Sequence, residues 1–467
     1  LFRSKSGVEV IVLDERALPG GQYFKQPAIE SLLIQQKAFD KQSLQGKSLV
    51  DDAYGLGVAI YSQAMVWNIV DGRDGFDVHV IKDNENCCIA TKQIIVATGA
   101  YERPFPIPGW TLPGFMTTGA VQTLLRSYRV TPGSKVLVCG NGPLNVQVAS
   151  ELVKGGVHVV GVIEASRPHN RRNLKALVAA IFRAPPLILK GLAYIARLRL
   201  AKVPMLYDHM LIRAEGVNRV EEAYVAAIDQ DGKPISDSEK RFEVDSICVG
   251  YGFIPNTDLT RLLRCVHKHD DDLGNLVVER GDDGATSRSG IFSVGDSGKL
   301  QGAQFALAQG ALAGFSVARN LVKTSVYDRE TSLAKRRLSR HQKFQLALWT
   351  LFDYPKAEYR WPSHKSPVIC RCEDVYVSDI MDAMEAGAGD IGSIKKMTRV
   401  GMGRCQGRYC GPIVLKMLTE HTHARPDQLS GFAPQAPVKP LPVGRAAEIK
   451  SEWHGETEGF EISRLNT

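Results

Sequence analysis

The stretch KVLVCGNGPLNVQVASELVKGGVHVVGVIEAS, residues 135–166, decides the fold of this chain. It begins with a short β-branched run, turns at Gly140-Asn141-Gly142-Pro143 and continues with apolar residues at helical spacing. After Gly155-Gly156 a second apolar run follows and ends at Glu164. A strand, a helix and a strand in this order form a βαβ unit, so the sequence predicts an α/β protein.

The turn of this unit predicts a nucleotide site. Gly140 and Gly142 match the first two glycines of a Gly-x-Gly-x-x-Gly motif, but Asn145 stands where the third glycine would let helix and strand pack closely. Glu164 suits a ribose 2′-hydroxyl. Basic side chains that suit a phosphate follow it: Arg167, Arg171 and Arg172. We predict a Rossmann-like domain with Gly140, Gly142 and Glu164 at its nucleotide-binding site. The sequence leaves open whether this site binds NAD(P), ATP, FAD or no nucleotide.

Further strand signals lie on both sides of this unit. Residues 8–13 (VEVIVL) follow what reads as the last turn of a helix over residues 1–7, and they end at Asp14 and Glu15. A carboxylate at the end of a strand can bind the hydroxyls of an adenosine ribose, which favours Asp14, with Glu15 as the alternative. Residues 93–97 and 291–295 are two more apolar runs that end in glycine turns, and a small-residue-rich helix is predicted over residues 303–320.

Three turns, in this order, resemble the fingerprints of glutathione-reductase-like flavoproteins: Gly20-Gly21-Gln22, Ala97-Thr98-Gly99-Ala100 and the run ending in Gly295-Asp296. The resemblance implies an FAD site in which Asp296 binds the ribityl chain. A helix opening at residues 301–304, with Gln304, would favour negative charge on the reduced flavin. The family's first Gly-x-Gly-x-x-Gly has no counterpart here, so we expect a strand and a glycine-rich turn to precede Leu1.

Four cysteines predict a metal cluster near the C-terminus. Cys370 and Cys372 are followed, after 32 residues, by Cys405 and Cys410 in GRCQGRYCGP. Thiolates ligate iron-sulfur clusters, and nearby glycines would let backbone amides reach the sulfurs: Gly401, Gly403, Gly407 and Gly411. Structural zinc sites more often use C-x2-C pairs, so zinc and unligated thiols are the less favoured alternatives. Residues 368–423 resemble the bacterioferritin-associated-ferredoxin-like 2Fe-2S domain.

The remaining residues exclude several classes of function. Cys139 and Cys248 lie on predicted core strands, where a thiol acts as a small apolar group. Outside the cysteine module there is no C-x2-C or C-x4-C pair, which argues against a thioredoxin-reductase-like activity. No group of His, Asp, Glu or Ser indicates a general base or a nucleophile, so the catalytic residues stay unknown. The chain is equipped for electron transfer.

The net charge of +8 is concentrated in residues 165–207, which contain nine Lys or Arg and no Asp or Glu. Without base-stacking aromatics or a reading motif, this charge does not indicate a nucleic-acid binder. The stretch predicts two helices broken at Pro185-Pro186, either solvated or facing a partner, with a membrane-surface helix as the alternative. No run approaches the roughly 18 apolar residues of a membrane span.

Nine cysteines are too sparse for a disulfide scaffold, and no secretory segment is visible. We therefore expect a cytoplasmic protein, with the periphery of the inner membrane as the alternative through its electron acceptor. The predicted domains are an FAD-binding domain (1–112 and 245–327), a second Rossmann-like domain (113–244), a helical linker (328–367), a 2Fe-2S domain (368–425) and an extended Pro-rich tail (426–467).

The chain as a whole resembles the alpha-type component of heteromeric opine and amino-acid dehydrogenases. The resemblance rests on residues 98–125, 138–149 and 291–314 together with the cysteine module, and spans nearly the whole chain. It implies a partner, which would be a smaller D-amino-acid-oxidase-like flavoprotein (the beta-type component), an FMN at the interface and a small-molecule amine substrate. The alternatives are a stand-alone NAD(P)H-dependent flavoprotein reductase with an iron-sulfur centre and a non-catalytic product.

Overall fold

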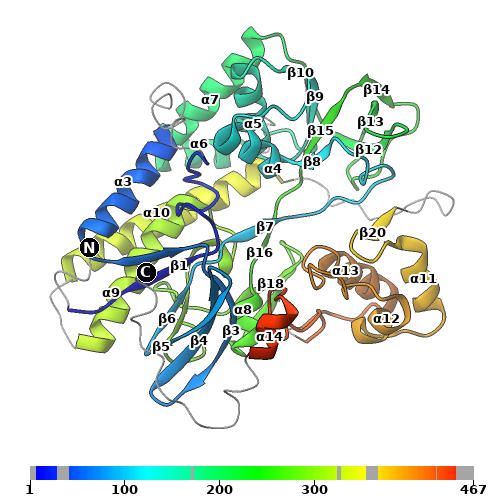
Figure 1. The fold of residues 1–467 in the computed structure, drawn as a ribbon. Coiled ribbons are helices and arrows are strands. Elements are labelled where there is room, and N and C mark those ends of the chain that lie inside the picture. Colours follow the sequence, from blue (N-terminus) through cyan, green and yellow to red (C-terminus); the bar gives the residue numbers. More distant parts are fainter. Residues whose placement is uncertain are drawn as a thin grey trace.

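The structure, a computed structural model, describes residues 7–28, 41–168, 170, 173–322, 328–353, 367–427 and 429–448. Two α/β domains and a small helical domain are visible in Figure 1, and the small domain lies at one side, next to β18 (Asn275–Val278). The predicted helical turn before Gly7 lies outside the described residues, as do Arg171 and Arg172.

The predicted βαβ unit is confirmed as β9 (Lys135–Gly140), α5 (Pro143–Lys154) and β10 (His158–Glu164). Parallel strands extend this unit into a sheet in the order β11-β10-β9-β15-β8, with β11 Met205–Tyr207, β15 Ser246–Gly250 and β8 Phe115–Thr117. Leu137 and Ile163 are fully buried on one side of this sheet, in a hydrophobic core shared with an antiparallel sheet. That sheet consists of β12 (His209–Glu215), β13 (Glu222–Ala227) and β14 (Lys240–Glu243).

The other α/β domain is built from segments on both sides of this insertion. Two parallel pairs form it: β1 (Ile11–Asp14) with β2 (Ala59–Ser62), and β6 (Ile94–Val96) with β19 (Ile291–Ser293). Side chains of β1, β6 and β19 share one hydrophobic cluster. An antiparallel meander packs against it, made of β3 (Met65–Gly72), β4 (Gly75–Lys82) and β5 (Glu85–Thr91).

Two strands carry the chain between the α/β domains. β7 (Ala100–Glu102) leads out of the first domain and β16 (Phe253–Pro255) leads back, and the two pair antiparallel (Figure 1). The smaller elements near them are α4 (Thr118–Thr123) with the π-helical segment Leu124–Tyr128, α8 (Asp258–Leu262), β17 (His267–Asp270) and β18 (Asn275–Val278). The crossover ribbon thus places the two domains beside each other.

Long helices cover the remaining surface of the α/β body. These are α3 (Lys41–Gly55), α9 (Ala303–Val322), α10 (Asp328–Leu351), α6 (Leu174–Arg183) and α7 (Pro185–Leu200). The predicted break at Pro185-Pro186 is confirmed, because α6 and α7 meet at a bend of 115°. Within the described residues no single helix has the length and apolarity needed to cross a membrane; α6 and α7 reach that composition only when taken together.

The C-terminal domain consists of short elements around its own core. They are β20 (Val368–Cys370), β21 (Val375–Tyr376), α11 (Val377–Glu385), α12 (Ile391–Thr398) and α13 (Gly411–Thr422). Ile380, Ile394 and Val414 are fully buried in that core. The expected two-helix spacer between the cysteine pairs is therefore α11 and α12.

The Pro-rich tail packs against the first α/β domain. Val438 is buried and its amide donates to the carbonyl of Trp67 at 2.9 Å, so this segment packs on β3 of the first domain. A short helix, α14 (Val443–Glu448), follows, and the carbonyl of Arg445 accepts a hydrogen bond from Asn86 on β5. The buried valine gives this segment a role within the chain.

Candidate functional site

Two predicted fingerprints lie side by side at one edge of a parallel sheet. β6 and β19 pair with Val96 opposite Ser293, so the turns that follow them leave the same edge. The amide of Val294 and the hydroxyl of Ser297 both donate to the carbonyl of Val96, at 3.0 and 3.1 Å. Open α/β sheets bind ligands at the carboxyl ends of their strands. This edge therefore has the geometry of a ligand site.

Gly295 and Asp296 build the loop that enters α9. Gly295 has a φ of +64°, and a Cβ there would lie 2.8 Å from the Cβ of Ala306, so only glycine fits. Oδ1 of Asp296 accepts from the amides of Gln301 and Gly302, at 2.7 and 2.9 Å. Oε1 of Gln301 is buried without a hydrogen-bond partner. A buried orphan acceptor at this point fits a ligand with a hydroxyl or N–H donor, as the ribityl chain and flavin ring provide.

The second fingerprint is held by a residue that sequence reasoning did not find. Gly99 has a φ of +69°, and its carbonyl accepts from the amide of Asn256 at 2.9 Å. Thr98 donates through its hydroxyl to the carbonyl of Asn256 at 3.0 Å. Gln304 is half-buried at the second position of α9. Asn256 lies between β16 and α8, where no local motif would have singled it out.

The first part of the predicted site is a tight turn after β1. Gly20 has a φ of +126°, and a Cβ there would lie 2.5 Å from the carbonyl oxygen of Phe24. Gly21 is also left-handed, at +60°, and Gln22 is exposed. Asp14 ends β1, and its Oδ1 accepts from the amide of Arg16. Glu15 instead forms an ion pair with Lys439 of the tail at 3.0 Å, which leaves Asp14 as the better candidate for a ribose.

Lys25, just after this turn, is a second residue that the sequence analysis missed. Its side chain is buried and donates to the carbonyl of Gly119 at 3.1 Å and to Oε1 of Gln122 at 3.3 Å. Burial lowers the pKa of Lys25 to about 8. Glu102 contacts the same helix end, where its Oε1 accepts from the amide of Gly119 at 2.6 Å. Lys25 thus ties the turn of the first domain to α4 of the second, and Glu102 ties β7 to the same helix end.

The nucleotide site predicted in the second domain is built around Glu164. Glu164 lies opposite Gly140 in the sheet, and its Oε2 accepts from the amide of Gly142 at 2.9 Å. Burial raises the pKa of Glu164 to about 8. Oε1 of Glu164 and the hydroxyl of Ser166 are buried without hydrogen-bond partners. These groups fit hydroxyls of a ribose, whereas the helix end offers few amides to a phosphate because Glu164 uses that of Gly142 and Pro143 has none.

Asn145 has a defined structural role in place of the missing glycine. It is almost fully buried, its Nδ2 donates to the carbonyl of Gly250 at 2.9 Å, and its Oδ1 accepts from Thr118 at 2.9 Å. A Cβ at Gly250 would lie 2.4 Å from Oδ1 of Asn145, and one at Gly140 would lie 2.5 Å from its Nδ2. Close packing of helix and strand is thus kept, because two glycines on the strands make room for the asparagine.

The four predicted cluster ligands meet as two pairs of thiols. Cys410 donates to Cys370 and lowers the pKa of Cys370 to about 5, while Cys372 donates to Cys405. Cys370 and Cys410 are buried, whereas Cys372 is exposed and Cys405 half-buried. Among the described residues no three His, Cys, Asp or Glu side chains are grouped as one metal ion would need. Two pairs of thiolates fit a dinuclear cluster, in which four cysteines hold two irons.

The glycines of this module have a packing role in addition to the amide contacts expected from the sequence. The amide of Gly401 does bond to Cys370. The ring of Phe432 also packs against three of these glycines. It would lie 2.8, 2.4 and 3.0 Å from a Cβ added at Gly401, Gly407 and Gly411, respectively. Gly403 makes room for Cys372, because a Cβ added at Gly403 would lie 2.2 Å from the Cβ of Cys372. Packing of a tail residue is therefore a main reason for these glycines, and short-range patterns could not have shown it.

The cysteine loop is docked on the first α/β domain. Arg408 forms an ion pair with Asp258 of α8 at 2.5 Å and donates to the carbonyl of Cys405 at 3.0 Å. The ring of Tyr409 meets that of Tyr101 edge-on, with centroids 5.9 Å apart. Tyr101 lies on β7, directly after Gly99-Ala100, and burial raises its pKa above the usual range. The residues between Cys405 and Cys410 thus join the cluster loop to the Gly99 turn.

Comparison with known proteins agrees with this architecture. A family model described as pyridine nucleotide-disulphide oxidoreductase matches residues 1–185 and 187–310. The chain belongs to this family. A second model, the BFD-like [2Fe-2S] binding domain, matches residues 368–420. This pyridine nucleotide-disulphide oxidoreductase family member therefore has an FAD-type redox fold joined to a [2Fe-2S]-binding domain, as the sequence predicted.

Relatives of this family member include components of larger enzymes. The opine oxidase A-subunit of Agrobacterium tumefaciens (strain Ach5) is 30% identical over 96% of this chain and 88% of its own length. Hydrogen cyanide synthase subunit HcnB of Pseudomonas aeruginosa is 29% identical over 96% of this chain and 95% of its own length. The structure of L-proline dehydrogenase from P. horikoshii matches with a TM-score of 0.64 and 19% identity, over 94% of this chain and 74% of that one. That likeness shows the shared fold.

Proposed function

We propose that this chain is the electron-transfer subunit of a heteromeric dehydrogenase or oxidase that acts on the C–N bond of an opine, a D-amino acid or hydroxyproline. The proposal rests on relatives that are themselves subunits of an opine oxidase and of hydrogen cyanide synthase. The single observation that carries it is the docking of the Cys405–Cys410 loop onto the strand that follows the Gly99 turn. This contact brings the two predicted redox sites of the chain together.

The geometry above supports a proposed set of cofactor-binding residues. Asp14 would bind the adenosine ribose, the turns at Gly20 and Gly99 would let backbone approach the cofactor, and Asp296 would bind the ribityl chain. Cys370, Cys372, Cys405 and Cys410 would hold the cluster. When bound, FAD and a [2Fe-2S] cluster supply electron transfer in single steps. The chain's part is to position both groups and to shield the space between them.

The partner in this proposal is a smaller D-amino-acid-oxidase-like flavoprotein of about 40 kDa, the size of a two-domain chain. The substrate would be oxidised on that partner or at an interface FMN, because the chain offers no evident general base. A pull-down from the source cell should return such a flavoprotein, and amine dehydrogenation with a dye acceptor should require both polypeptides. Turnover of an amine by the purified chain alone would contradict the proposal.

One observation favours a second candidate function, the stand-alone NAD(P)H-dependent reductase. Buried Glu164 and Ser166 have orphan oxygens at a site that fits a ribose. Rapid bleaching of the flavin by NADH or NADPH under anaerobic conditions would support this alternative. No bleaching, together with activity only when both polypeptides are mixed, would leave electron transfer within a heteromeric enzyme as the function.

A further inference from the structure

Helices α6 and α7 expose a row of large apolar side chains to solvent. Phe182 is 79% exposed, Leu189 66% and Leu200 85%. The other members of the row have exposed fractions between 41% and 61%: Leu174, Val178, Ile181 and Leu192. On α6 these residues adjoin or are three or four positions apart, which places them on one side of the helix. On α7 Leu189 and Leu192 are three positions apart, and Leu200 follows eight positions later on the same side. Each helix therefore presents one outward apolar stripe. An exposed apolar surface of this kind usually marks an interaction site.

The inward faces of both helices are already used by the fold. Ala180 of α6 and Ala184, between α6 and α7, pack with Phe344 and Ala347 of α10 in one hydrophobic cluster. α7 packs against α5, and its Leu198 is fully buried there. The outward stripes are therefore a second apolar surface on helices whose core-facing side is complete.

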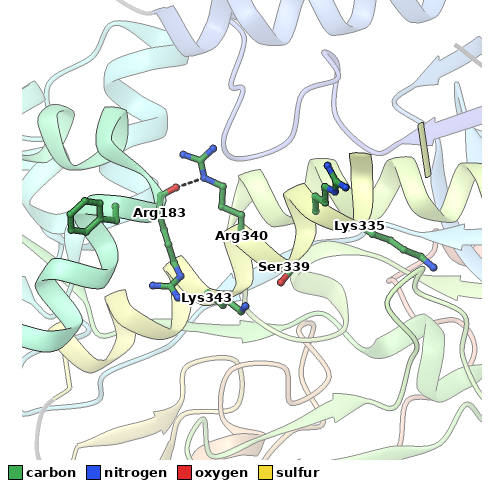
Figure 2. A pocket seen from close by; sticks show the side chains of 7 residues that line it. Arg183, Lys335, Ser339, Arg340 and Lys343 are labelled. Carbon is green, nitrogen blue, oxygen red and sulfur yellow. Dashed lines mark hydrogen bonds between the residues drawn. The ribbon is translucent and has the colours of Figure 1, made fainter. Parts of the chain in front are cut away.

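Positive charge surrounds these stripes. Residues 165–207 have no acidic side chain, and the described cations of this segment include Lys175, Arg183, Lys190, Arg199 and Lys202. Arg197 instead faces α5, where it donates to the hydroxyl of Ser150 at 2.8 Å. A hollow of about 660 Å³ lies where α6 meets α10, lined by Phe182, Ser339 and five cations: Arg183, Lys335, Arg336, Arg340 and Lys343. Figure 2 shows these side chains, with Arg340 of α10 donating to the carbonyl of Arg183. An apolar group and five cations around one hollow suit an anionic head with an apolar tail.

The dimensions of the helices favour lying on a bilayer over crossing it. At about 1.5 Å per residue, the 10 residues of α6 and the 16 of α7 extend about 15 and 24 Å. Each is shorter than the hydrocarbon core of a bilayer, about 30 Å, and the 115° bend prevents them from acting as one span. Apolar stripes with flanking Lys and Arg are the pattern of helices that insert shallowly among anionic headgroups.

We propose that the α6–α7 face docks on the surface of an anionic phospholipid bilayer. The stripes of Phe182, Leu189 and Leu192 enter the interfacial region, and the cationic hollow between α6 and α10 binds headgroup phosphates. This inference concerns where the protein works, and it stands independently of the substrate proposed above. It favours the membrane-surface alternative for the basic stretch over a merely solvated pair of helices.

Vesicle co-sedimentation of the purified full chain tests the proposal. The chain should pellet with vesicles of equal phosphatidylglycerol and phosphatidylcholine, at least tenfold more than with phosphatidylcholine alone, and added salt should release it. Phe182→Asp/Leu189→Asp should lower vesicle binding at least tenfold. Both residues are exposed, so folding should be kept, which circular dichroism checks. Lys335→Glu/Lys343→Glu should also weaken binding to the anionic vesicles.

Matched controls place two acidic residues elsewhere on the surface. Val217 and Leu429 are 83% and 79% exposed, and Val217→Asp/Leu429→Asp should leave vesicle binding unchanged. Equal loss in this control, or no pelleting of the wild-type chain at low salt, would overturn the proposal. If the Phe182→Asp/Leu189→Asp variant instead loses a co-purifying acidic protein while the wild-type chain ignores vesicles, the face is a protein interface and the membrane assignment is wrong.

Discussion

At the scale of single residues, the cysteine pairs are the most direct test of the cluster. Cys410→Ser removes a buried thiol that we predict to be a cluster ligand, so the variant should lack the [2Fe-2S] electron paramagnetic resonance signal and the two irons per chain that we expect of the reduced wild-type protein. Cys139→Ser is the matched control, because Cys139 is equally buried but lies on β9, far from the module in sequence. Its signal should persist. Zinc in place of iron on metal analysis would contradict the assignment.

Glu164 should make stability depend on pH. The pKa of Glu164 is about 8 in the folded chain, compared with about 4.3 when unfolded, so between these values the folded chain keeps a proton that the unfolded chain has released. Its contribution to stability is complete below about pH 4 and is lost as the pH rises through about 8. Glu164→Gln cannot ionise at this position. Its free energy of unfolding, measured by thermal unfolding between pH 5 and pH 9, should therefore fall less steeply with pH than that of the wild-type chain. The two slopes should differ by at most about 1.4 kcal/mol per pH unit.

The control for this experiment is Glu243→Gln. The Glu243 side chain is 69% exposed on β14, so the variant should keep the wild-type dependence on pH. An identical slope for Glu164→Gln and the wild-type chain would show that Glu164 is ionised in the folded protein.

At the scale of elements, contact between α5 and β15 depends on a glycine. A methyl group at Gly250 would lie 2.4 Å from Asn145 and 2.7 Å from the hydroxyl of Thr118, so Gly250→Ala should lower the free energy of unfolding by about 1–3 kcal/mol. Gly310, in the middle of α9, has nothing within 4 Å of an added Cβ. Gly310→Ala should therefore raise stability, by about 0.5–1 kcal/mol. Denaturant unfolding distinguishes the two, and a shift of the same sign in both variants would contradict the steric account.

The docking of the cysteine loop should depend on one ion pair. Arg408→Leu leaves Asp258 without its partner in a mostly buried position, which should weaken the contact by about 1–3 kcal/mol. Hydrogen exchange of the amides in residues 403–411 should accelerate, while iron content stays near that of the wild-type chain. Arg425→Leu is the control, because the Arg425–Asp271 pair is exposed and contributes little. Unchanged exchange in Arg408→Leu would show that the loop is held by other contacts.

At the scale of the whole molecule, the sequence predicted the fold class and the cysteine module because both depend on local patterns. Residues 135–166 contain a β-branched run, a glycine turn and a helical period. The four cysteines of the module are recognisable because they lie close together in the sequence. The helix pair and its break followed from Pro185-Pro186. The residues proposed for the FAD and second nucleotide sites remain predictions, although the structure places Asp14, Gly140 and Glu164 at the ends of the expected strands.

The contacts that join distant segments could not be predicted in this way. Asn256, Lys25 and Phe432 act through neighbours far away in sequence, so no spacing rule points to them. The tail was predicted as extended because of its prolines, but nothing in the sequence pointed to the burial of Val438, whose amide bonds to Trp67 of β3. Such roles depend on contacts between residues that are distant in sequence, and local patterns in one sequence do not indicate which distant residues meet.

The crossover ribbon of β7 and β16 also bears on how such a protein can be built up. Glu102 and Phe253 are direct partners in this ribbon, so everything between them enters and leaves the first domain at one point. A short loop joining these two residues would close an ordinary β-hairpin. The second domain is thus inserted into the first at a single point. One genetic insertion or deletion between Glu102 and Phe253 could add or remove it without changing the register of the strands in the first domain.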